Sequence, residues 1–196
     1  MSDSEREHWD TRYVSEGART TEPASFLVEV ADRFPAESSI LDVGGGSGRN
    51  AVWLAGRGHR VTIADISEEG LKLARHAANE AGVALTTRRM DFDTDPFPEG
   101  PWDVIIDFHF IKRYLFESFL AALRPGGLLV FCRATLKNLE RNERPPHPYL
   151  LQQGEGWDLL SGFELLVARE GWSVEVRHEF EALARAPEEV RTDASG

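Results

Sequence analysis

Residues 40–48 read Ile-Leu-Asp-Val-Gly-Gly-Gly-Ser-Gly, and this stretch decides the fold expected for the chain. Its first four residues are typical of a short buried strand, and the glycines let the backbone turn sharply into a helix over residues 51–55. A second strand begins at Arg60 and stops on Asp65. In this arrangement the helix N-terminus offers free N–H groups to an anion, and the acid that ends the second strand can accept ribose hydroxyls. The stretch therefore predicts a site for a ligand that contains a nucleoside.

The alternation of short apolar runs with helix-period stretches continues from residue 38 to 135, as in βαβ units of a parallel sheet. Ser67 is expected to cap a helix that Gly82 ends. Further strands are expected at 84–90, 102–108 and 128–132. A helix face is expected before the last of them, formed by Leu115, Phe116, Phe119, Leu120 and Leu123. Strands at 163–168 and 172–177 should pair antiparallel across a tight turn at Glu170-Gly171.

These elements predict an α/β fold with a single doubly wound, mostly parallel seven-stranded sheet and an antiparallel last strand. One domain is expected over residues 1–196, with its core at 38–180. Residues 1–38 and the proline-containing stretch 136–160 do not fit the sheet. We expect the first to be a lid or cap and the second an insertion near the substrate side, because both emerge at the carboxyl edge of the sheet. The tail from Ala186 onward is expected to be frayed.

Composition narrows the classes of partner. The 196-residue chain has a net charge of −11, which argues against binding to a nucleic-acid backbone. It has no apolar run long enough to span a membrane and no signal-peptide pattern, so a cytoplasmic location is expected. The single cysteine, Cys132, and six scattered histidines predict no metal site. The expected partner is a small-molecule acceptor, and a homodimer stays open.

The spacing of the glycine turn indicates which ligand it holds. The dinucleotide fingerprint needs a third glycine where this chain has Arg49, and no P-loop motif is present. Instead, Asp42 stands two residues before a Gly-x-Gly-x-Gly run. This pattern resembles motif I of the class I S-adenosylmethionine-dependent methyltransferases. The resemblance implies S-adenosylmethionine as cofactor, with the acid suited to its ammonium group and the helix N-terminus to its carboxylate.

Further segments are similar to the same family. Met90-Asp91-Phe92 resembles the pair that holds the adenine, Trp102–Ile106 resembles the fourth strand, and Leu123–Gly127 resembles the turn before the fifth. Aromatic residues near the N-terminus could close over the sulfonium by cation–π attraction, or could simply anchor that segment. The cofactor-binding residues that the resemblance implies are Trp9, Tyr13, Asp42, Gly44, Gly46, Gly48, Asn50, Asp65, Ile66, Asp91 and Phe92.

A narrower resemblance concerns the tellurite-resistance-type (TehB-like) and thiopurine methyltransferases. It is carried by Trp9–Tyr13, by residues 48–55, and by the Arg144–Pro148 region leading into Leu150-Leu151. This branch implies a soft acceptor such as a thiol or a chalcogen oxyanion. Where the branch often has a second histidine, this chain has Lys112-Arg113, which puts that substrate in doubt.

The acceptor is expected beyond the fourth strand, at Asp107-Phe108-His109-Phe110. This segment has no prolines, which disfavours the amide and base N-methyltransferases. His109 is the candidate base or anion contact, with a scaffold role as the alternative. A positive pocket for an acidic substrate could draw on Lys112, Arg113, Arg133 and Arg144, although an exposed helix face explains the first two equally well. Arg49 could contact the cofactor carboxylate or an acidic substrate, or it could form a structural salt bridge. The candidate substrate-binding residues are Arg49, Arg113, Arg133 and Arg144.

The sequence thus favours a methyltransferase that acts on a small molecule, with a thiol, a chalcogen oxyanion or a small acid as acceptor. One alternative is a catalytically silent module that binds the cofactor and acts as a partner or sensor. A second is a nicotinamide-dependent oxidoreductase on a similar sheet, against which Arg49 counts.

Overall fold

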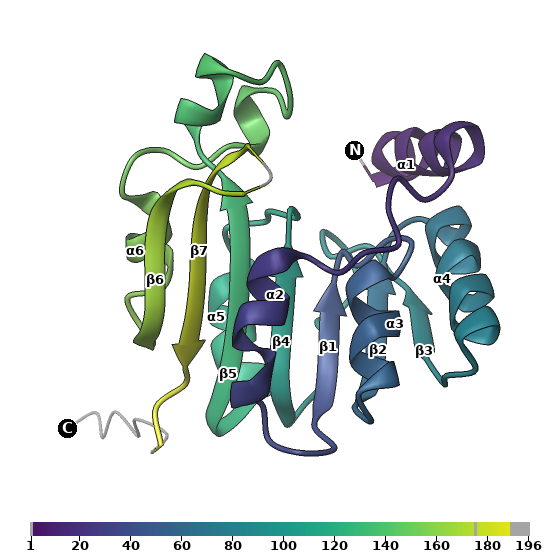
Figure 1. Cartoon of the computed structure of the whole chain (residues 1–196), viewed down its shortest axis with the longest axis horizontal. Coiled ribbons are helices and arrows are strands. Elements are labelled where there is room, and N and C mark those ends of the chain that lie inside the picture. The colour runs from purple at the N-terminus through teal and green to yellow at the C-terminus, as the bar shows by residue number, and fades with distance from the viewer. Residues whose placement is uncertain (1, 175, 189–196) are drawn as a thin grey trace.

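The computed structural model describes residues 2–174 and 176–188. Within these ranges seven strands form one sheet, in the order β3-β2-β1-β4-β5-β7-β6 (Figure 1). The strands are β1 (Ser39–Val43), β2 (Arg60–Asp65), β3 (Thr86–Arg89), β4 (Trp102–Phe108), β5 (Leu123–Ala134), β6 (Glu164–Trp172) and β7 (His178–Arg185). The first five are parallel, and β7 runs antiparallel to both β5 and β6. The predicted doubly wound sheet with an antiparallel last strand is confirmed.

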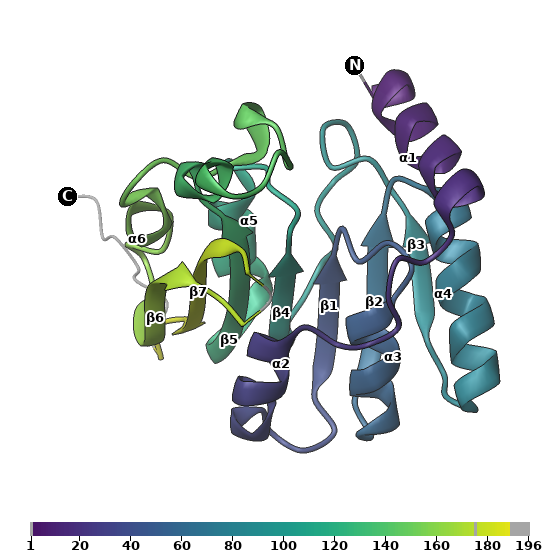
Figure 2. The same cartoon turned by 45° about the horizontal axis from the view of Figure 1, so that its top comes forward.

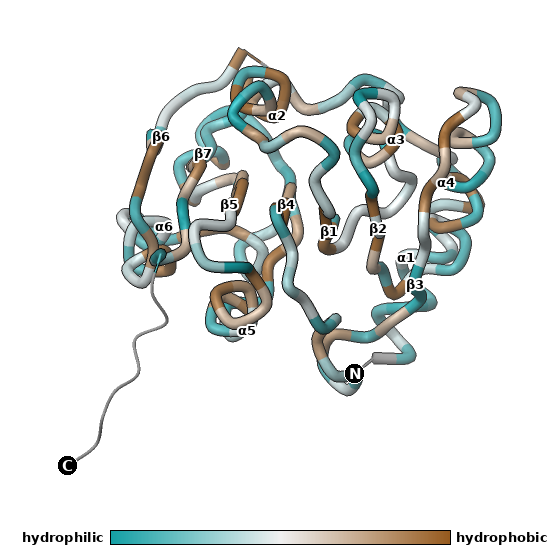
Figure 3. Tube along the Cα trace, turned by 90° about the horizontal axis from the view of Figure 1, so that it is seen from below, coloured by the Kyte–Doolittle hydropathy of each residue, from teal (hydrophilic) through white to brown (hydrophobic). Residues whose placement is uncertain are grey.

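Helices cover both faces of the sheet (Figures 1 and 3). One face carries α2 (Ser25–Val30), α3 (Arg49–Gly56) and α4 (Glu68–Ala81), and the other carries α5 (Leu115–Ala122) and α6 (Glu155–Leu159). The apolar side chains accordingly form two buried clusters, one on each side of the strands. In Figure 3 the apolar tracts fall on the central strands and on the helices that face them. Because the chain changes faces between β1 and β4, the carboxyl ends of these strands form the crevice in which such folds bind ligands.

The predicted ends of α4 are confirmed. Ser67 stands at the N-cap, and its Oγ accepts a hydrogen bond of 3.0 Å from the Gly70 N–H. Gly82 ends the helix in the left-handed conformation that L side chains rarely adopt.

The predicted positions of the last two strands and of the turn between them were wrong. Glu170 and Gly171 do not form a turn: they lie inside β6, opposite Phe180 and Glu179 of β7. The chain reverses later, between Trp172 and His178. The segment His178–Glu181 contains two acids and a histidine, so its polarity hid a strand that is buried on both faces.

Three smaller predictions also need correction. Leu123 is not on the face of α5: it begins β5 and pairs with Trp102 of β4. The third strand is shorter than predicted and begins at Thr86. Ala186 is buried and its N–H donates to the Gly127 carbonyl, so the chain is ordered at the point where fraying was expected. Residues 189–196 of the predicted tail lie outside the described residues.

Two segments lie over the carboxyl edge of the sheet, as Figure 2 shows. One is α1 (Ser2–Glu16), which packs against α4. The other is the 136–160 segment, which holds the short 3-10 helices η2 (Leu136–Glu140) and η3 (His147–Tyr149) as well as α6. The second half of the N-terminal segment behaves differently, since α2 buries Phe26, Leu27 and Val30 in the core, and η1 (Ala31–Arg33) continues it. No helix in the described ranges is long and apolar enough to cross a bilayer.

Candidate active site

Three acids lie at the carboxyl ends of three strands that are neighbours in the sheet. They are Asp42 near the end of β1, Asp65 at the end of β2 and Asp107 near the end of β4. All three are buried. Burial of carboxylates without cations is costly, so their pKa values rise until the protonated form competes with the charged form. The edge of the sheet thus holds acidic groups that a positively charged ligand would stabilise.

Asp42 shows this most clearly. Only 1% of its surface is exposed, and its Oδ2 has no hydrogen-bond partner among the described residues. Burial, with repulsion from Asp65 as a second cause, raises the pKa of Asp42 to about 8, although the charge of Arg49 opposes the shift. An ammonium group placed against this carboxylate would supply both the missing charge and the missing hydrogen bond.

The pKa of Asp65 is also raised, by less than that of Asp42. Burial raises its pKa to about 6, while hydrogen bonds from two backbone N–H groups work in the opposite direction. These N–H groups belong to Gly46, at 2.9 Å, and Ser67, at 2.8 Å. Asp65 therefore ties the glycine turn to the start of α4 and still lines the cavity described below.

The glycine turn is covered by α1. Gly46 has a φ of +52°, and a Cβ atom there would overlap the phenol oxygen of Tyr13. The helix is fixed at this place by Asp10, whose Oδ1 accepts hydrogen bonds from the Ser67 Oγ, at 2.7 Å, and from the Glu69 N–H, at 3.2 Å. Burial raises the pKa of Tyr13 to about 12, so its side chain is a neutral phenol at physiological pH. The N-terminal helix thus packs directly on motif I.

A cavity lies between α1, the glycine turn and the ends of β2 and β4. Its lining contains eight of the residues predicted for the site and three that were not in that set. The residues are Glu5, Trp9, Tyr13, Gly44, Asp65, Ile66, Asp91, Phe92, His109, Phe110 and Lys112. Cofactor-binding candidates and the catalytic candidate His109 therefore line one continuous cavity.

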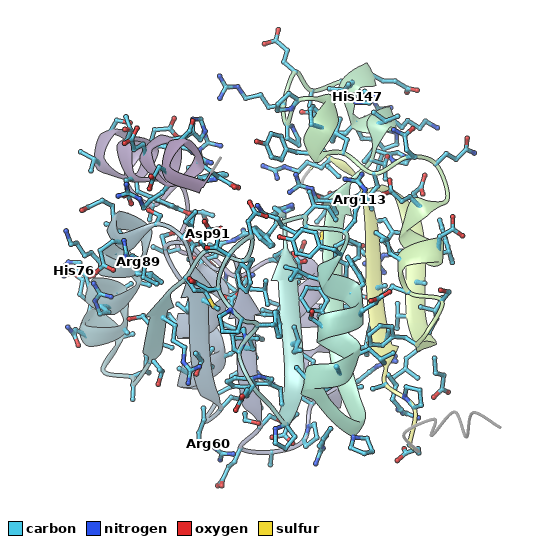
Figure 4. All side chains as sticks on the ribbon, turned by 180° about the vertical axis from the view of Figure 1, so that it is seen from behind. Arg60, His76, Arg89, Asp91, Arg113 and His147 are labelled. Carbon is cyan, nitrogen blue, oxygen red and sulfur yellow. The ribbon has the colours of Figure 1, made fainter. Side chains whose placement is uncertain are left out.

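The loop after β3 forms one wall of this cavity. Phe92 is buried, and its ring lies 5.4 Å from that of Phe110 and 5.9 Å from that of Phe97. Asp91 lies at the carboxyl edge on the side of α1 (Figure 4). Its Oδ1 accepts a hydrogen bond from the Asp93 N–H, which is the loop-capping role that also explains this residue. An apolar ring and a carboxylate are thus adjacent, as a purine with an exocyclic amino group requires.

Not all predicted cofactor residues reach the cavity with their side chains. Asn50 is buried, and its Oδ1 accepts a hydrogen bond of 2.9 Å from the Ala24 N–H, so its side chain fastens the N-terminal segment to α3. Gly48 is the left-handed N-cap of α3 and does not line the cavity. Asp42 lies behind the glycine turn, where a Cβ atom on Gly45 would come within 2.6 Å of its Cγ.

His109 follows β4 in an unusual conformation. Its φ of +64° is rare for a residue with a side chain and is typical of functional sites. Its N–H donates to the Cys132 carbonyl at 2.9 Å, and its carbonyl accepts a hydrogen bond from the Arg133 guanidinium. On the other side its Nδ1 lies 3.5 Å from Oε1 of Glu179. Burial, followed by the charges of nearby arginines, holds the pKa of His109 well below its usual value.

The four candidate arginines do not form one pocket. Arg49, in the first turn of α3, acts electrostatically on both Asp42 and His109. Arg133 is buried and donates to the Tyr149 carbonyl as well as to His109. Arg144 is exposed on the 136–160 segment.

Arg113 has a structural set of partners. Its Nη2 donates to Glu155 and to the Leu150 carbonyl, each at 3.1 Å. It therefore links the loop after β4 to the 136–160 segment, at the base of the part that carries His147 in Figure 4. Lys112 is likewise paired, at 2.7 Å with Asp93 and at 3.1 Å with Glu5 of α1.

One cluster of metal-ligating side chains occurs in the described part of the chain. Ligand atoms of His109, Cys132 and Glu179 lie within 4.8 Å of one another. The charges of three arginines act on His109, namely Arg177, Arg49 and Arg133, while Asp107 and Glu179 act on Arg133 with the opposite sign. Of the three clustered residues, His109 lines the cavity.

Sequence reasoning missed several residues. Glu5 lines the cavity and was not predicted, whereas Phe110 and Lys112, which also line it, were named only as part of the acceptor segment and of a possible positive pocket. Glu179 was missed because the last strand was predicted at residues 172–177, whereas it runs from His178 to Arg185. The alternation Glu179-Phe180-Glu181-Ala182 is the signal that could have revealed it.

Comparison with known proteins agrees with this geometry. Residues 40–127 match a family described as a methyltransferase domain. The chain is 33% identical over 109 residues to the tRNA 5-carboxymethoxyuridine methyltransferase of Escherichia coli (strain K12), a match that covers 51% of this chain and 41% of that enzyme. The chain thus spans about two fifths of the length of this curated relative.

Solved structures share the fold at lower identity. TehB from Haemophilus influenzae superposes with a TM-score of 0.72 at 20% identity, covering 89% of this chain and 66% of TehB. A structure described as "Conversion of a Disulfide Bond into a Thioacetal Group during Echinomycin Biosynthesis" superposes with a TM-score of 0.76 at 19% identity, covering 95% of this chain and 93% of that protein.

The strand order, the glycine turn and the acids that flank it define a Rossmann-like domain that binds S-adenosylmethionine. Residues 40–127 match the methyltransferase-domain family, and the fold is the one that Rossmann-like class I methyltransferases share. One feature of the site fits this cofactor directly: the buried Oδ2 of Asp42 has no hydrogen-bond partner in the described part of the chain, and an ammonium group would supply one.

Proposed function

We propose that this domain transfers the sulfonium methyl group of S-adenosylmethionine to a small acceptor bound beside His109. One observation carries the proposal: the cavity lined by Asp65, Phe92 and Tyr13 continues to His109 and Phe110 at the end of β4. A donor held over the first three strands would therefore face an acceptor held at the fourth and fifth strands.

Each part of the cofactor has a matching residue. Asp42 would bind the ammonium, the N-terminus of α3 the carboxylate, and Asp65 the ribose hydroxyls. Phe92 and Asp91 would hold the adenine. When bound, S-adenosylmethionine supplies a methyl group on a positively charged sulfur that leaves readily as a thioether. The work of the protein is to align the acceptor with that methyl group and to exclude water.

The α1 helix supports water exclusion. Trp9 and Tyr13 present aromatic rings to the cavity, with centroids 6.2 Å apart. Such rings attract a sulfonium by cation–π interaction. Two tethers hold the helix over the site: Asp10 at the start of α4, and Glu5, whose Oε2 lies 3.1 Å from the Lys112 Nζ.

A small acceptor is favoured over a macromolecule. The E. coli relative acts on tRNA, but this chain carries a net charge of −11. Lys112 and Arg113, the basic residues next to the cavity mouth, are already paired with acids. Phosphate binding needs several available cations, whereas a thiol, a chalcogen oxyanion or a small acid needs one or two. Arg49, whose charge acts on both Asp42 and His109, can serve that smaller need.

The test is an acceptor screen with S-adenosylmethionine, in which formation of S-adenosylhomocysteine is quantified by mass spectrometry. The panel contains small thiols, selenite, tellurite, small carboxylic acids and a tRNA transcript. Turnover with at least one small acceptor is expected. Turnover with tRNA alone would contradict the proposal. Tight cofactor binding without turnover on any acceptor would favour the silent binding module instead.

A further inference from the structure

Two hydrogen bonds hold the backbone of His109. Its N–H donates to the Cys132 carbonyl and its carbonyl accepts from the Arg133 guanidinium, which fixes the residue in its left-handed conformation at the end of β4. A side chain in this conformation carries a backbone cost of the order of 1–2 kcal/mol, which persists only where the surroundings enforce it. The surroundings here enforce it at the cavity wall, so the fold fixes the point at which the side chain of His109 leaves the backbone.

Glu179 supplies a carboxylate behind this ring. It lies on β7 opposite Ala134 of β5 and is only 3% exposed. Its Oε1 is 3.5 Å from the Nδ1 of His109. A carboxylate at this distance forms no hydrogen bond to Nδ1, but its charge favours the tautomer with the proton on that nitrogen, which leaves Nε2 as the ring atom able to accept a proton. Because His109 lines the cavity, this is the arrangement of a general base and its orienting acid.

The charges around His109 define which proton such a base could take. The ligand atoms of Glu179 and Cys132, both from the sheet, lie close to the ring, and the charges of Arg49, Arg133 and Arg177 act on it from α3, β5 and the segment before β7. Burial, and after it the charges of the arginines, lowers the pKa of His109, which keeps the imidazole neutral and makes it a weak base. The arginines also stabilise an anion that forms in front of it. A weak base beside cations can deprotonate a thiol, whose ordinary pKa is about 8.5, far more easily than an alcohol.

We propose that His109 and Glu179 form a proton-accepting pair and that the acceptor is a thiol, which arrives protonated. This inference rests on the proposed methyl transfer. The thiol proton passes to Nε2 of His109, and the sulfur electron pair forms the new S–CH₃ bond. The C–S bond to the sulfonium breaks, and its electron pair stays on the departing thioether sulfur. The imidazolium, stabilised by Glu179, then releases the proton to water. Glu179 acts through His109 and is a positioning residue.

The pair predicts a specific kinetic signature with thiol acceptors such as 2-mercaptoethanol and thiophenol. His109→Gly should lower kcat by about two orders of magnitude, the scale of general-base catalysis, and added imidazole should restore part of it. This variant is expected to fold, because glycine adopts a φ of +64° without strain. Glu179→Gln should lower kcat by about tenfold with little change in KM, and should shift the acidic limb of the pH profile downward, because the imidazolium loses its carboxylate.

Glu181→Gln is the matched control. Glu181 is a second buried carboxylate on the same strand, but it pairs with Arg169 at 2.6 Å instead of His109. Its variant reports the general cost of removing a buried charge from β7, so its pH profile should stay that of the parent. Binding of S-adenosylhomocysteine by calorimetry confirms that each variant is folded.

Three results would overturn the inference while leaving methyl transfer intact. They are turnover of selenite or tellurite without turnover of any thiol, an unchanged kcat and pH profile in Glu179→Gln, and full activity in His109→Gly. Loss of thiol turnover on addition of a metal chelator would also overturn it, because the cluster would then be a metal site. Absence of turnover by the parent protein on every acceptor would instead refute the proposed function.

Discussion

The phenol oxygen of Tyr13 occupies the space into which a side chain at Gly46 would project. Helix α1 therefore packs against motif I so closely at this point that only glycine leaves room for the Tyr13 hydroxyl. Gly46→Ala should displace Tyr13 and also strain a backbone whose φ is +52°. We expect the affinity for S-adenosylmethionine to fall by at least about tenfold and stability by about 1–2 kcal/mol. Calorimetry and urea denaturation measure the two effects.

Gly56→Ala provides the control for this glycine. A Cβ atom at Gly56 in α3 would meet nothing within 4 Å, and the residue has no left-handed φ. Its substitution should leave cofactor affinity unchanged and stabilise the protein by up to about 0.5–1 kcal/mol. Equal losses of affinity in both variants would show that the fit between Tyr13 and Gly46 has no special role.

Asp42 should make the ligand-free protein less stable as the pH rises. Its folded-state pKa of about 8 lies above the value of about 4 for an unfolded chain. The folded protein therefore holds a proton that the unfolded chain has released, so stability falls as the pH rises across this window. Asp42→Asn removes the effect. Relative to the parent, this variant should gain about 1–3 kcal/mol between about pH 5 and about pH 8 while losing cofactor affinity.

Urea denaturation of both proteins at the two pH values measures the gain. Addition of saturating S-adenosylmethionine should flatten the pH dependence of the parent, because the ligand would place a positive charge against Asp42. A parent protein whose stability rises between the two pH values would mean that Asp42 is solvated or paired in the folded state.

The parallel strands that alternate with helices, the glycine turn and the ends of α4 were all predictable, because they follow from local rules: apolar runs, glycine conformations and an N-cap serine. The last two strands were not. The acids at positions 179 and 181 make that segment read as surface, and only their long-range partners, His109 and Arg169, explain their burial. The same reason decides which site residues were predictable. Asp65 and Phe92 belong to local sequence motifs, whereas the position of Glu179 depends on a strand that returns beside β5.

Arg113 was a candidate for substrate binding, and its partners suggest another role. Arg113→Ala should loosen the 136–160 segment by removing the contacts to Glu155 and Leu150. Hydrogen exchange in that segment should accelerate, while cofactor affinity should stay within about twofold, because the exposed ion pair contributes little to overall stability. A large loss of cofactor affinity with unchanged exchange would place Arg113 in the cofactor site instead.

A variant of Arg49 can show whether this residue serves the acceptor or the cofactor. Its charge acts on Asp42 on one side and on His109 on the other. If it serves the acceptor, Arg49→Met should lower kcat/KM for the acceptor by about 10- to 100-fold and leave the Kd of S-adenosylhomocysteine within about threefold. A change confined to the Kd would reassign Arg49 to the cofactor carboxylate.

Calorimetric titration with S-adenosylmethionine, S-adenosylhomocysteine and NAD tests the central claim most directly. We predict one micromolar site for the first two ligands, no binding of NAD, and a loss of about 1.5–3 kcal/mol of binding free energy in Asp65→Ala, which removes the charged acceptor for the ribose hydroxyls. Binding of NAD in place of S-adenosylmethionine, or an Asp65→Ala variant that binds as tightly as the parent, would contradict the account.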